Sequence, residues 1–345
     1  MAIRQVTMQD VADAAGVSRM TVSRALRENS VVNAKTRKRI LDVVQELGYV
    51  PDQAAGSLSS RKSGFVSVLI PSLDNPHFAR TVQILNEELS VVGMQVLLGH
   101  TGYSAEKEEE LVESFLRRRP EAMLLSCDGH TEKSRSLLEK SGIPVIELWE
   151  RPHEPIQHVV GFSNFEAAQT LTRSLLDLGY SKIAFIGETR ALSSRNAERF
   201  RGFQSVLEQA GLPSDRHVYQ GARPFNIASG VACCKKVMEE FPDTDCIFCA
   251  SDPAAFGVLT ALQEMGLSVP DDIGVAGFGD FDIAHYCRPS LTTIGVDPNS
   301  LARKANELLK RVLNISADED STLDAREIIE VVPSLKLRGS TRQKD

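Results

Sequence analysis

Short apolar runs alternate with longer amphipathic stretches from Gly64 to beyond residue 270. This alternation is typical of βαβ units, in which parallel strands form a sheet that amphipathic helices cover. The first series of predicted strands lies near 66–70, 95–98, 123–125 and 145–148, and the second begins near 159 and continues at 183–186, 246–250 and 273–276. The predicted helices cover 78–92, 105–118, 133–141, 165–178, 197–210, 227–240 and 253–265. We therefore expect an α/β body with two parallel sheets and a cleft between them.

The loops that follow the predicted strands are polar, and they are where a ligand site is expected. In open parallel sheets, ligands bind beyond the carboxyl ends of the strands. The sequence has no GxxxxGK[ST] motif, no GxGxxG motif between a strand and a helix, and no arrangement typical of a catalytic nucleophile. We expect a small-molecule binding cleft, no cofactor and no enzymatic activity.

The chain has six cysteines, of which only Cys246 and Cys249 form a CxxC motif. That motif lies in an apolar strand-like run, where residues three apart point to opposite faces, and no second CxxC or histidine pair completes a zinc site. We expect reduced, buried thiols and no metal.

Residues 7–28 have the pattern of a helix-turn-helix. Thr7 and Asp10 have the spacing of a capping box, Gly16 permits a turn, and Ser18 begins a second helix. Arginine can pair bidentately with guanine, methionine can contact thymine methyl groups, and hydroxyl side chains can reach phosphates or base edges. The candidate DNA contacts are Thr7, Ser18, Arg19, Met20, Thr21, Ser23 and Arg24. The alternative is a capped helical hairpin with solvated arginines.

Charge is divided unevenly along the chain. Residues 1–62 contain 10 Lys and Arg against 6 Asp and Glu, whereas the whole chain has a net charge of −7. The basic N-terminal part can approach the phosphates of a nucleic acid, and the acidic remainder of the chain disfavours indiscriminate nucleic-acid binding. No apolar run reaches the roughly 18 residues of a membrane span, and no secretory signal is recognised. We expect a cytoplasmic protein without a membrane partner, associated with the nucleoid when it is bound to its operator.

The chain is expected to divide into a head, a hinge and a body. Residues 33–48 predict a third amphipathic helix, which completes a small three-helix domain over 1–50. Pro51 and the weakly hydrophobic segment after it predict a linker or conditional hinge helix over 51–62. The body covers 63–345, with one lobe at about 63–160 and 296–322 and the other at about 161–292 and 323–340.

In this order of parts the chain resembles the lactose/galactose repressor family of bacterial transcription regulators over nearly its whole length. The motifs that carry the resemblance are Asp10-Val-Ala, Val17-Ser with Thr21-Val-Ser-Arg24, Leu47-Gly-Tyr-Val-Pro51, Ile70-Pro, Gly179-Tyr, Arg199-Phe-Arg-Gly-Phe203, Ser251-Asp-Pro-Ala-Ala-Phe-Gly257 and Pro289-Ser-Leu-Thr-Thr293. The resemblance implies a homodimer, with a tetramer as an open alternative, on a pseudo-palindromic operator. It also implies paired hinge helices in the minor groove, with Leu58 as the wedge at the central base step.

The hinge departs from the family pattern. Asp52 and Gln53 stand where the family commonly has Asn and Arg, and Gly56 lies inside the expected hinge helix. An interior glycine costs about 0.5 to 1 kcal/mol relative to alanine. We expect hinge order to depend strongly on DNA.

The resemblance also implies the effector site. Arg199 falls at the family's cleft arginine, Asp252 at an aspartate that accepts from sugar hydroxyls, and Phe225 and Phe78 at ligand-covering positions. Asp252 could instead be a helix N-cap, and both phenylalanines could be core. Ser251 replaces the usual asparagine, and the carboxylate of Asp280 is shifted by one position, so recognition of a neutral pyranose is in doubt.

Within the family the chain is most similar to the gluconate-repressor branch. The motifs are Ser18-Arg-Met-Thr-Val-Ser-Arg24, His100-Thr-Gly-Tyr103, Ile146-Glu-Leu148 and Gly161-Phe-Ser-Asn-Phe-Glu-Ala-Ala168. This similarity adds further candidate effector contacts, which are His100, Tyr103, Glu147, Asn164, Glu166 and Asp280.

The sequence therefore predicts a repressor of sugar-acid catabolism or uptake genes that D-gluconate or a related sugar acid releases from its operator. The choice among gluconate, 6-phosphogluconate and 2-ketogluconate stays open, as does the choice between inducer and co-repressor. A family member that senses another metabolite, and a sugar-binding transport protein, are the alternatives.

Overall fold

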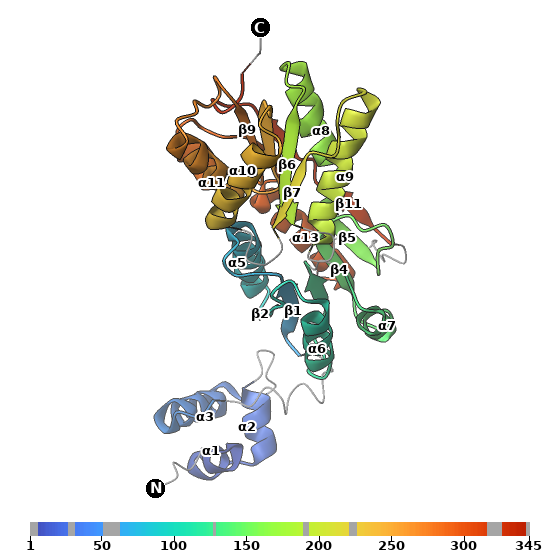
Figure 1. The fold of residues 1–345 in the computed structure, drawn as a ribbon. Helices are drawn as coiled ribbons and strands as arrows, with labels where there is room; N and C mark the ends of the chain where they lie inside the picture. The colour runs from blue at the N-terminus through green and yellow to red at the C-terminus, as the bar shows by residue number, and fades with distance from the viewer. Residues whose placement is uncertain are drawn as a thin grey trace. The chain divides into compact units, whose positions relative to one another are not determined.

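The computed structural model describes residues 6–26, 32–50, 63–126, 129–188, 193–220, 226–315 and 326–342 of the 345-residue chain. The chain divides into two compact units, Met1–Ser63 and Gly64–Asp345, which we call the head and the body (Figure 1). The predicted hinge over 51–62, with Leu58, lies outside the described residues. Each unit is described by itself.

The head contains the three predicted helices, α1 (Met8–Ala15), α2 (Arg19–Ala25) and α3 (Ala34–Leu47). Thr7 and Asp10 form the predicted capping box, and Ser18 caps α2 by accepting a hydrogen bond from the Thr21 backbone N–H. Gly16 ends α1 with φ of +61°, a left-handed conformation that favours glycine. The helices share a small apolar core.

One basic residue of α3 joins this helix to α2. The Arg37 Nε–H donates to the Ala25 carbonyl oxygen at 3.1 Å, at the last residue of α2. A positive charge at a helix C-terminus also interacts favourably with the helix dipole. Arg37 therefore fixes α2 against α3.

The body is built on two six-stranded sheets. The first sheet has the spatial order β11 (Ile328–Glu330), β5 (His158–Phe162), β4 (Val145–Glu150), β3 (Met123–Leu125), β1 (Phe65–Ile70) and β2 (Gln95–His100). The second has the order β12 (Ser334–Lys336), β10 (Thr292–Gly295), β9 (Gly274–Phe278), β8 (Cys246–Cys249), β6 (Ile183–Glu188) and β7 (His217–Gln220). All strand pairs in the first sheet are parallel, as predicted. In the second sheet the strand pairs are parallel as predicted, except that the short β12 pairs antiparallel with β10.

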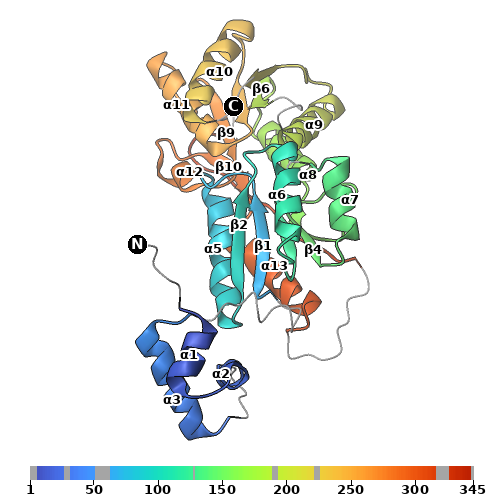
Figure 2. The same ribbon diagram turned by 90° about the horizontal axis from the view of Figure 1, so that it is seen from below.

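Helices cover both sheets and define two lobes. The first lobe contains the first sheet with α5 (Pro76–Val91), α6 (Ala105–Leu116), α7 (Glu132–Lys140) and α13 (Pro298–Val312). The second contains the other sheet with α8 (Asn164–Asp177), α9 (Ser194–Gln209), α10 (Ile227–Glu240), α11 (Asp252–Glu264) and α12 (Asp282–Tyr286). Figure 2 shows α5 and α6 on either side of β1 and β2.

The chain crosses between the lobes at positions that differ from the predicted boundaries. The whole of β5, to Phe162, pairs with β4, so it belongs to the first lobe rather than beginning the second series. Ile328–Glu330 pairs with β5, so the last crossing lies after residue 330 and not near 323. Pairing between strands this far apart in sequence has no local signal, which is why the sequence did not predict it.

None of the helices in the described ranges has both the length and the apolar character that a membrane span needs. Cys233, Cys234, Cys246, Cys249 and Cys287 are buried free thiols. Burial raises the pKa of Cys234 to about 12, and it raises that of Cys249 as well. These two thiols are therefore protonated and unreactive at neutral pH.

Candidate functional site

The exposed face of α2 carries most of the predicted DNA contacts. Ser18, Arg19, Met20 and Arg24 are exposed, and Met20 retains 63% of its accessible surface. Thr21 and Ser23 are half-buried, and the Thr21 hydroxyl lies 2.9 Å from that of Ser18. Thr7, also exposed, is engaged in its capping box. An exposed methionine between two arginines is costly in water but suits a surface that base edges cover.

The body contains a cleft of about 1000 Å³ at the carboxyl ends of strands from both lobes. This volume is at the upper end of the range for small-molecule sites, roughly 300 to 1,000 Å³. The first lobe contributes the loop after β1, the start of α5 and the ends of β2 and β4, whereas the second contributes the ends of β6, β8 and β9. Five predicted residues line the cleft, namely Phe78, His100, Tyr103, Asn164 and Arg199. Phe225 lies outside the described residues.

Arg199 is oriented by three groups of the second lobe. Its Nε–H donates to Asn164 Oδ1 at 2.9 Å, and Nη1 donates to the Ala250 carbonyl oxygen at 2.6 Å. The centre of the guanidinium lies 3.7 Å from the centroid of the Phe278 ring, in a cation–π contact. These contacts fix the plane of the guanidinium at the end of β8 and β9, where it can bind a carboxylate or a pair of hydroxyl groups.

Two carboxylates predicted to contact the effector, Glu147 and Glu166, pair with other groups of the protein. Glu147 accepts from the Ile156 N–H at 2.6 Å and contacts His130 Nε2 at 3.2 Å. Glu166 is exposed and forms an ion pair with Arg151 at 3.0 Å. Neither lines the large cleft, although Glu147 lines a smaller cavity, and contact of either residue with an effector stays a prediction.

The two predicted aspartates also lie outside the lining of the cleft. Asp252 is completely buried and accepts from the Thr293 hydroxyl at 2.6 Å and from the Phe281 N–H at 2.8 Å. Burial raises the pKa of Asp252 to about 6. Asp280 forms an ion pair with Arg338 at 2.6 Å. Both aspartates brace the loop after β9 through these partners, and their contact with an effector stays a prediction.

Several cleft residues were not predicted. Glu188 accepts from Asn196 Nδ2 at 2.8 Å, and both residues are buried at the cleft. Arg195 lies on the same helix as Arg199, four residues before it, so helical spacing could have identified it. The polar groups contributed by α9 are therefore more numerous than the resemblance alone indicated.

An aromatic cluster lines the cleft across the two lobes. The His77 ring lies 4.2 Å from the Phe281 ring and 5.7 Å from the Trp149 ring, and His77 Nε2 lies 2.7 Å from the Gly279 carbonyl oxygen. Burial lowers the pKa of His77, so the neutral ring donates to this carbonyl at neutral pH. Trp149, the single tryptophan of the chain, has φ of +73° and a buried Nε1 without a hydrogen-bond partner in the described ranges. Trp149 is thus a natural fluorescent reporter of this cleft.

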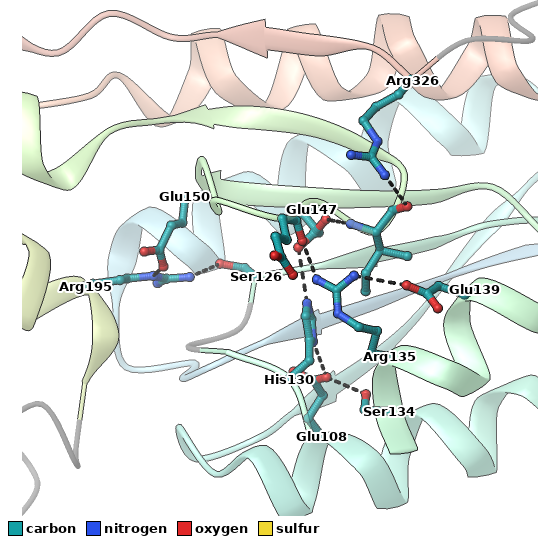
Figure 3. Close-up of polar contacts among 12 residues, drawn as sticks. Glu108, Ser126, His130, Ser134, Arg135, Glu139, Glu147, Glu150, Arg195 and Arg326 are labelled. Atoms are coloured by element: carbon teal, nitrogen blue, oxygen red, sulfur yellow. Dashed lines mark hydrogen bonds and ion pairs between the residues drawn. The ribbon is translucent and has the colours of Figure 1, made fainter. Parts of the chain in front are cut away.

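A buried polar cluster lies beside the cleft in the first lobe (Figure 3). His130 Nδ1 lies 2.5 Å from Glu108 Oε1, and the Ser134 hydroxyl donates to the same oxygen at 2.6 Å. Burial disfavours a charged His130, but its hydrogen bonds to Glu108 and Glu147 outweigh burial and raise the pKa of His130 to about 9. His130 is therefore a buried cation at neutral pH.

Comparison with known proteins identifies both units. Residues 7–52 match the family described as "Bacterial regulatory proteins, lacI family", and residues 172–341 match a periplasmic binding protein-like domain. The chain is 35% identical to the HTH-type transcriptional regulator GntR of Escherichia coli over 292 residues, which are 84% of this chain and 87% of the relative. It is 33% identical to the regulator of the same title from Pseudomonas aeruginosa, over 92% of each chain.

A solved structure shares the same architecture. A LacI-family transcriptional regulator from Silicibacter pomeroyi superposes with a TM-score of 0.87 at 33% identity, over 97% of this chain and 99% of that one. The chain therefore has the same order of parts as this regulator, with the head first and the two-lobed body after it, as the sequence motifs predicted.

Proposed function

Because this chain belongs to the LacI family of DNA-binding bacterial transcriptional regulators, we propose that it represses genes for the catabolism or uptake of a gluconate-type sugar acid. The proposed active form is a homodimer on a pseudo-palindromic operator. A sugar acid bound in the cleft between the lobes releases the protein from that operator.

The orientation of Arg199 in the cleft is the observation that supports a small oxygen-rich ligand in this cleft. A guanidinium fixed by Asn164, Ala250 and Phe278 is prepared to bind an anion or a hydroxyl pair without further ordering. The similarity of the motifs near His100 and Asn164 to the gluconate-repressor branch supports an acid rather than a neutral sugar. Asn196 and Tyr103 add polar groups on opposite lobes for the hydroxyls.

The test is a calorimetric titration of the full chain with D-gluconate, with 6-phosphogluconate, 2-ketogluconate and galactose as comparators. Trp149 fluorescence provides a second readout from within the cleft. We expect saturable binding of gluconate, and a loss of affinity of tenfold or more in Arg199→Ala, which corresponds to about 1.4 kcal/mol.

The matched control is Arg201→Ala. Arg201 lies on the same helix, is exposed, and pairs with Glu198 rather than facing the cleft. It should bind gluconate like the wild type. Binding of a different comparator, with no response to gluconate, would contradict the ligand proposed here and identify another effector for the same cleft.

A further inference from the structure

A second arginine in the cleft connects the two lobes. Arg195 comes from α9 in the second lobe and lines the cleft four residues before Arg199. Its Nη2 donates to the Ser126 hydroxyl at 3.2 Å, and its Nε lies 3.2 Å from Glu150 Oε2 (Figure 3). Its guanidinium also lies over the Phe78 ring, 5.5 Å from the centroid. These three partners all belong to the first lobe, so Arg195 crosses between the lobes at the wall of the cleft.

The ion pair between Arg195 and Glu150 is desolvated but long. The side chain of Arg195 is 9% exposed and that of Glu150 is 18% exposed. The 3.2 Å separation exceeds the roughly 2.7 to 2.9 Å of good charge-assisted hydrogen bonds. Desolvation is expensive for both charges, and a long contact offsets it less well than a forked one. A carboxylate that met the guanidinium in a fork would interact with it more strongly than Glu150 does.

Glu150 has space into which it can turn. It lines a smaller cavity of about 250 Å³, whereas Arg195 lines the large cleft. His130 and His153 line the same cavity. Glu147 and Glu198 line this cavity as well, and His130, whose pKa is raised to about 9 by its hydrogen bonds to Glu108 and Glu147 against the effect of burial, is already paired with those two carboxylates. The cavity therefore offers Glu150 space to turn into, and not a second unpaired cation.

Arg195 and Arg199 differ in the partners they have in this structure. Arg199 donates to the neutral oxygens of Asn164 and Ala250, whereas Arg195 already has a carboxylate at its guanidinium. The surroundings of Arg195 thus accommodate a carboxylate.

We propose that Arg195 binds the carboxylate of the effector, which replaces Glu150 on the guanidinium, and that Arg195 thereby determines the preference for a sugar acid over a neutral sugar. This inference rests on the proposed function and assigns the acid specificity within it. Because Glu150 belongs to the first lobe and Arg195 to the second, the exchange also changes a contact between the lobes.

The test compares D-gluconate with D-gluconamide, which has the same hydroxyl groups but no charge. Each is titrated by calorimetry into the wild type, Arg195→Gln and Glu150→Gln. We expect Arg195→Gln to lower gluconate affinity tenfold or more while gluconamide affinity changes by less than about twofold. Glu150→Gln removes the competing carboxylate, so it should raise gluconate affinity severalfold and leave gluconamide affinity unchanged.

Arg151→Gln is the matched control. Arg151 is the next residue after Glu150, and it pairs with Glu166 and Glu330 outside the cleft. It should bind both ligands like the wild type. Retained gluconamide binding in Arg195→Gln shows that this variant is folded, and Glu150→Gln tests the exchange independently of it.

The outcomes separate this inference from the proposed function. A wild-type chain that binds no gluconate overturns the proposed ligand and this assignment with it. If the wild type binds gluconate but Arg195→Gln weakens both ligands equally, the proposed function stands and Arg195 has only a structural role. A fall in gluconate affinity in Glu150→Gln also overturns the exchange.

Discussion

At the scale of single residues, the role of a carboxylate depends on partners that are remote in the sequence. Asp252 occupies the position where the family resemblance implies a ligand contact, yet Thr293 and Phe281 occupy both of its oxygens. Nor is it the helix N-cap, since the Ser251 side chain performs that function. Glu147 is likewise engaged with His130 and Ile156. These contacts fix the carboxylates of both residues within the lobes around the cleft.

The buried cluster of His130 predicts a pH-dependent stability. The ordinary pKa of histidine is 6.5 and that of His130 is about 9, so protonated His130 stabilises the folded state below pH 6.5, and this contribution is lost as the pH rises through 9. His130→Gln should therefore lower the free energy of unfolding by about 3 kcal/mol at pH 6, and by much less at pH 9.5. Urea unfolding followed by circular dichroism at both pH values measures the difference.

His153→Gln is the control for this prediction. His153 lines the same small cavity but is exposed. Its replacement should change stability little at either pH. Equal destabilisation of His130→Gln at pH 6 and pH 9.5 would show that packing, and not the charge of the imidazole, explains the effect.

At the scale of elements, two pairs of helices approach closely at a glycine, which has no side chain to keep the backbones apart. A Cβ atom on Gly202 of α9 would lie 2.3 Å from the Phe165 carbonyl oxygen of α8. The same holds between α10 and α11, where a Cβ atom on Gly257 would lie 2.1 Å from the Ile227 carbonyl oxygen. Close packing of α8 against α9 positions Arg195 and Arg199, since both residues are on α9.

Gly257→Ala tests this close packing. Alanine has the higher helix propensity, by about 1 kcal/mol, so a helix without neighbours would gain stability. Here the added methyl group meets a backbone carbonyl that cannot rotate away, so we expect a net loss of about 1 to 3 kcal/mol in thermal or urea unfolding. Gln263→Ala, at an exposed position of the same helix, should change stability by less than about 0.5 kcal/mol. A stabilised Gly257→Ala would refute the close approach.

The exposed face of α2 predicts sequence-specific DNA recognition by Arg24. A bidentate contact to a base contributes about 1 to 3 kcal/mol of discrimination. Arg24→Ala should therefore weaken binding to an operator, selected from random DNA with the wild type, by about tenfold or more, while binding to random DNA changes little. Fluorescence anisotropy with both DNAs at the same salt concentration measures this.

Arg39→Ala removes the same charge from an exposed position on α3 and serves as the control. It should change binding to both DNAs equally. If Arg24→Ala also weakens both DNAs equally, Arg24 contacts phosphates and does not read bases.

At the scale of the whole molecule, the proposed function requires ligand binding in the body to be linked to DNA binding by the head. The effector must bind the DNA-free form more tightly by the same factor by which it weakens operator binding, typically 5- to 150-fold. Arg199→Ala should retain operator affinity and lose its response to gluconate, because Arg199 lies in the body and α2 in the head. If gluconate instead raises the affinity for the operator, gluconate is a co-repressor and not an inducer.

The sequence by itself determined the elements and their class. The periodicity of apolar residues, the caps at Thr7 and Ser18 and the glycine at Gly16 are local signals. The helices α1, α2 and α3 lie where these signals predict, as do β1 to β5 of the first sheet and β6, β8 and β9 of the second. The motif order also identified the family and placed Arg199 in the cleft. Local patterns are sufficient for these features because neighbouring residues produce them.

How the sheets and helices pack decides which of the candidate polar groups line the cleft, and where the chain crosses between the lobes. Glu150 and Arg195 are 45 residues apart, Asp252 and Thr293 are 41 apart, and β11 joins β5 from the far end of the chain. Such pairs form because burial requires each polar group to find a partner, and that partner is chosen by how the sheets and helices pack. No local pattern contains this information, so the acid-binding role proposed for Arg195 became visible only in the folded molecule.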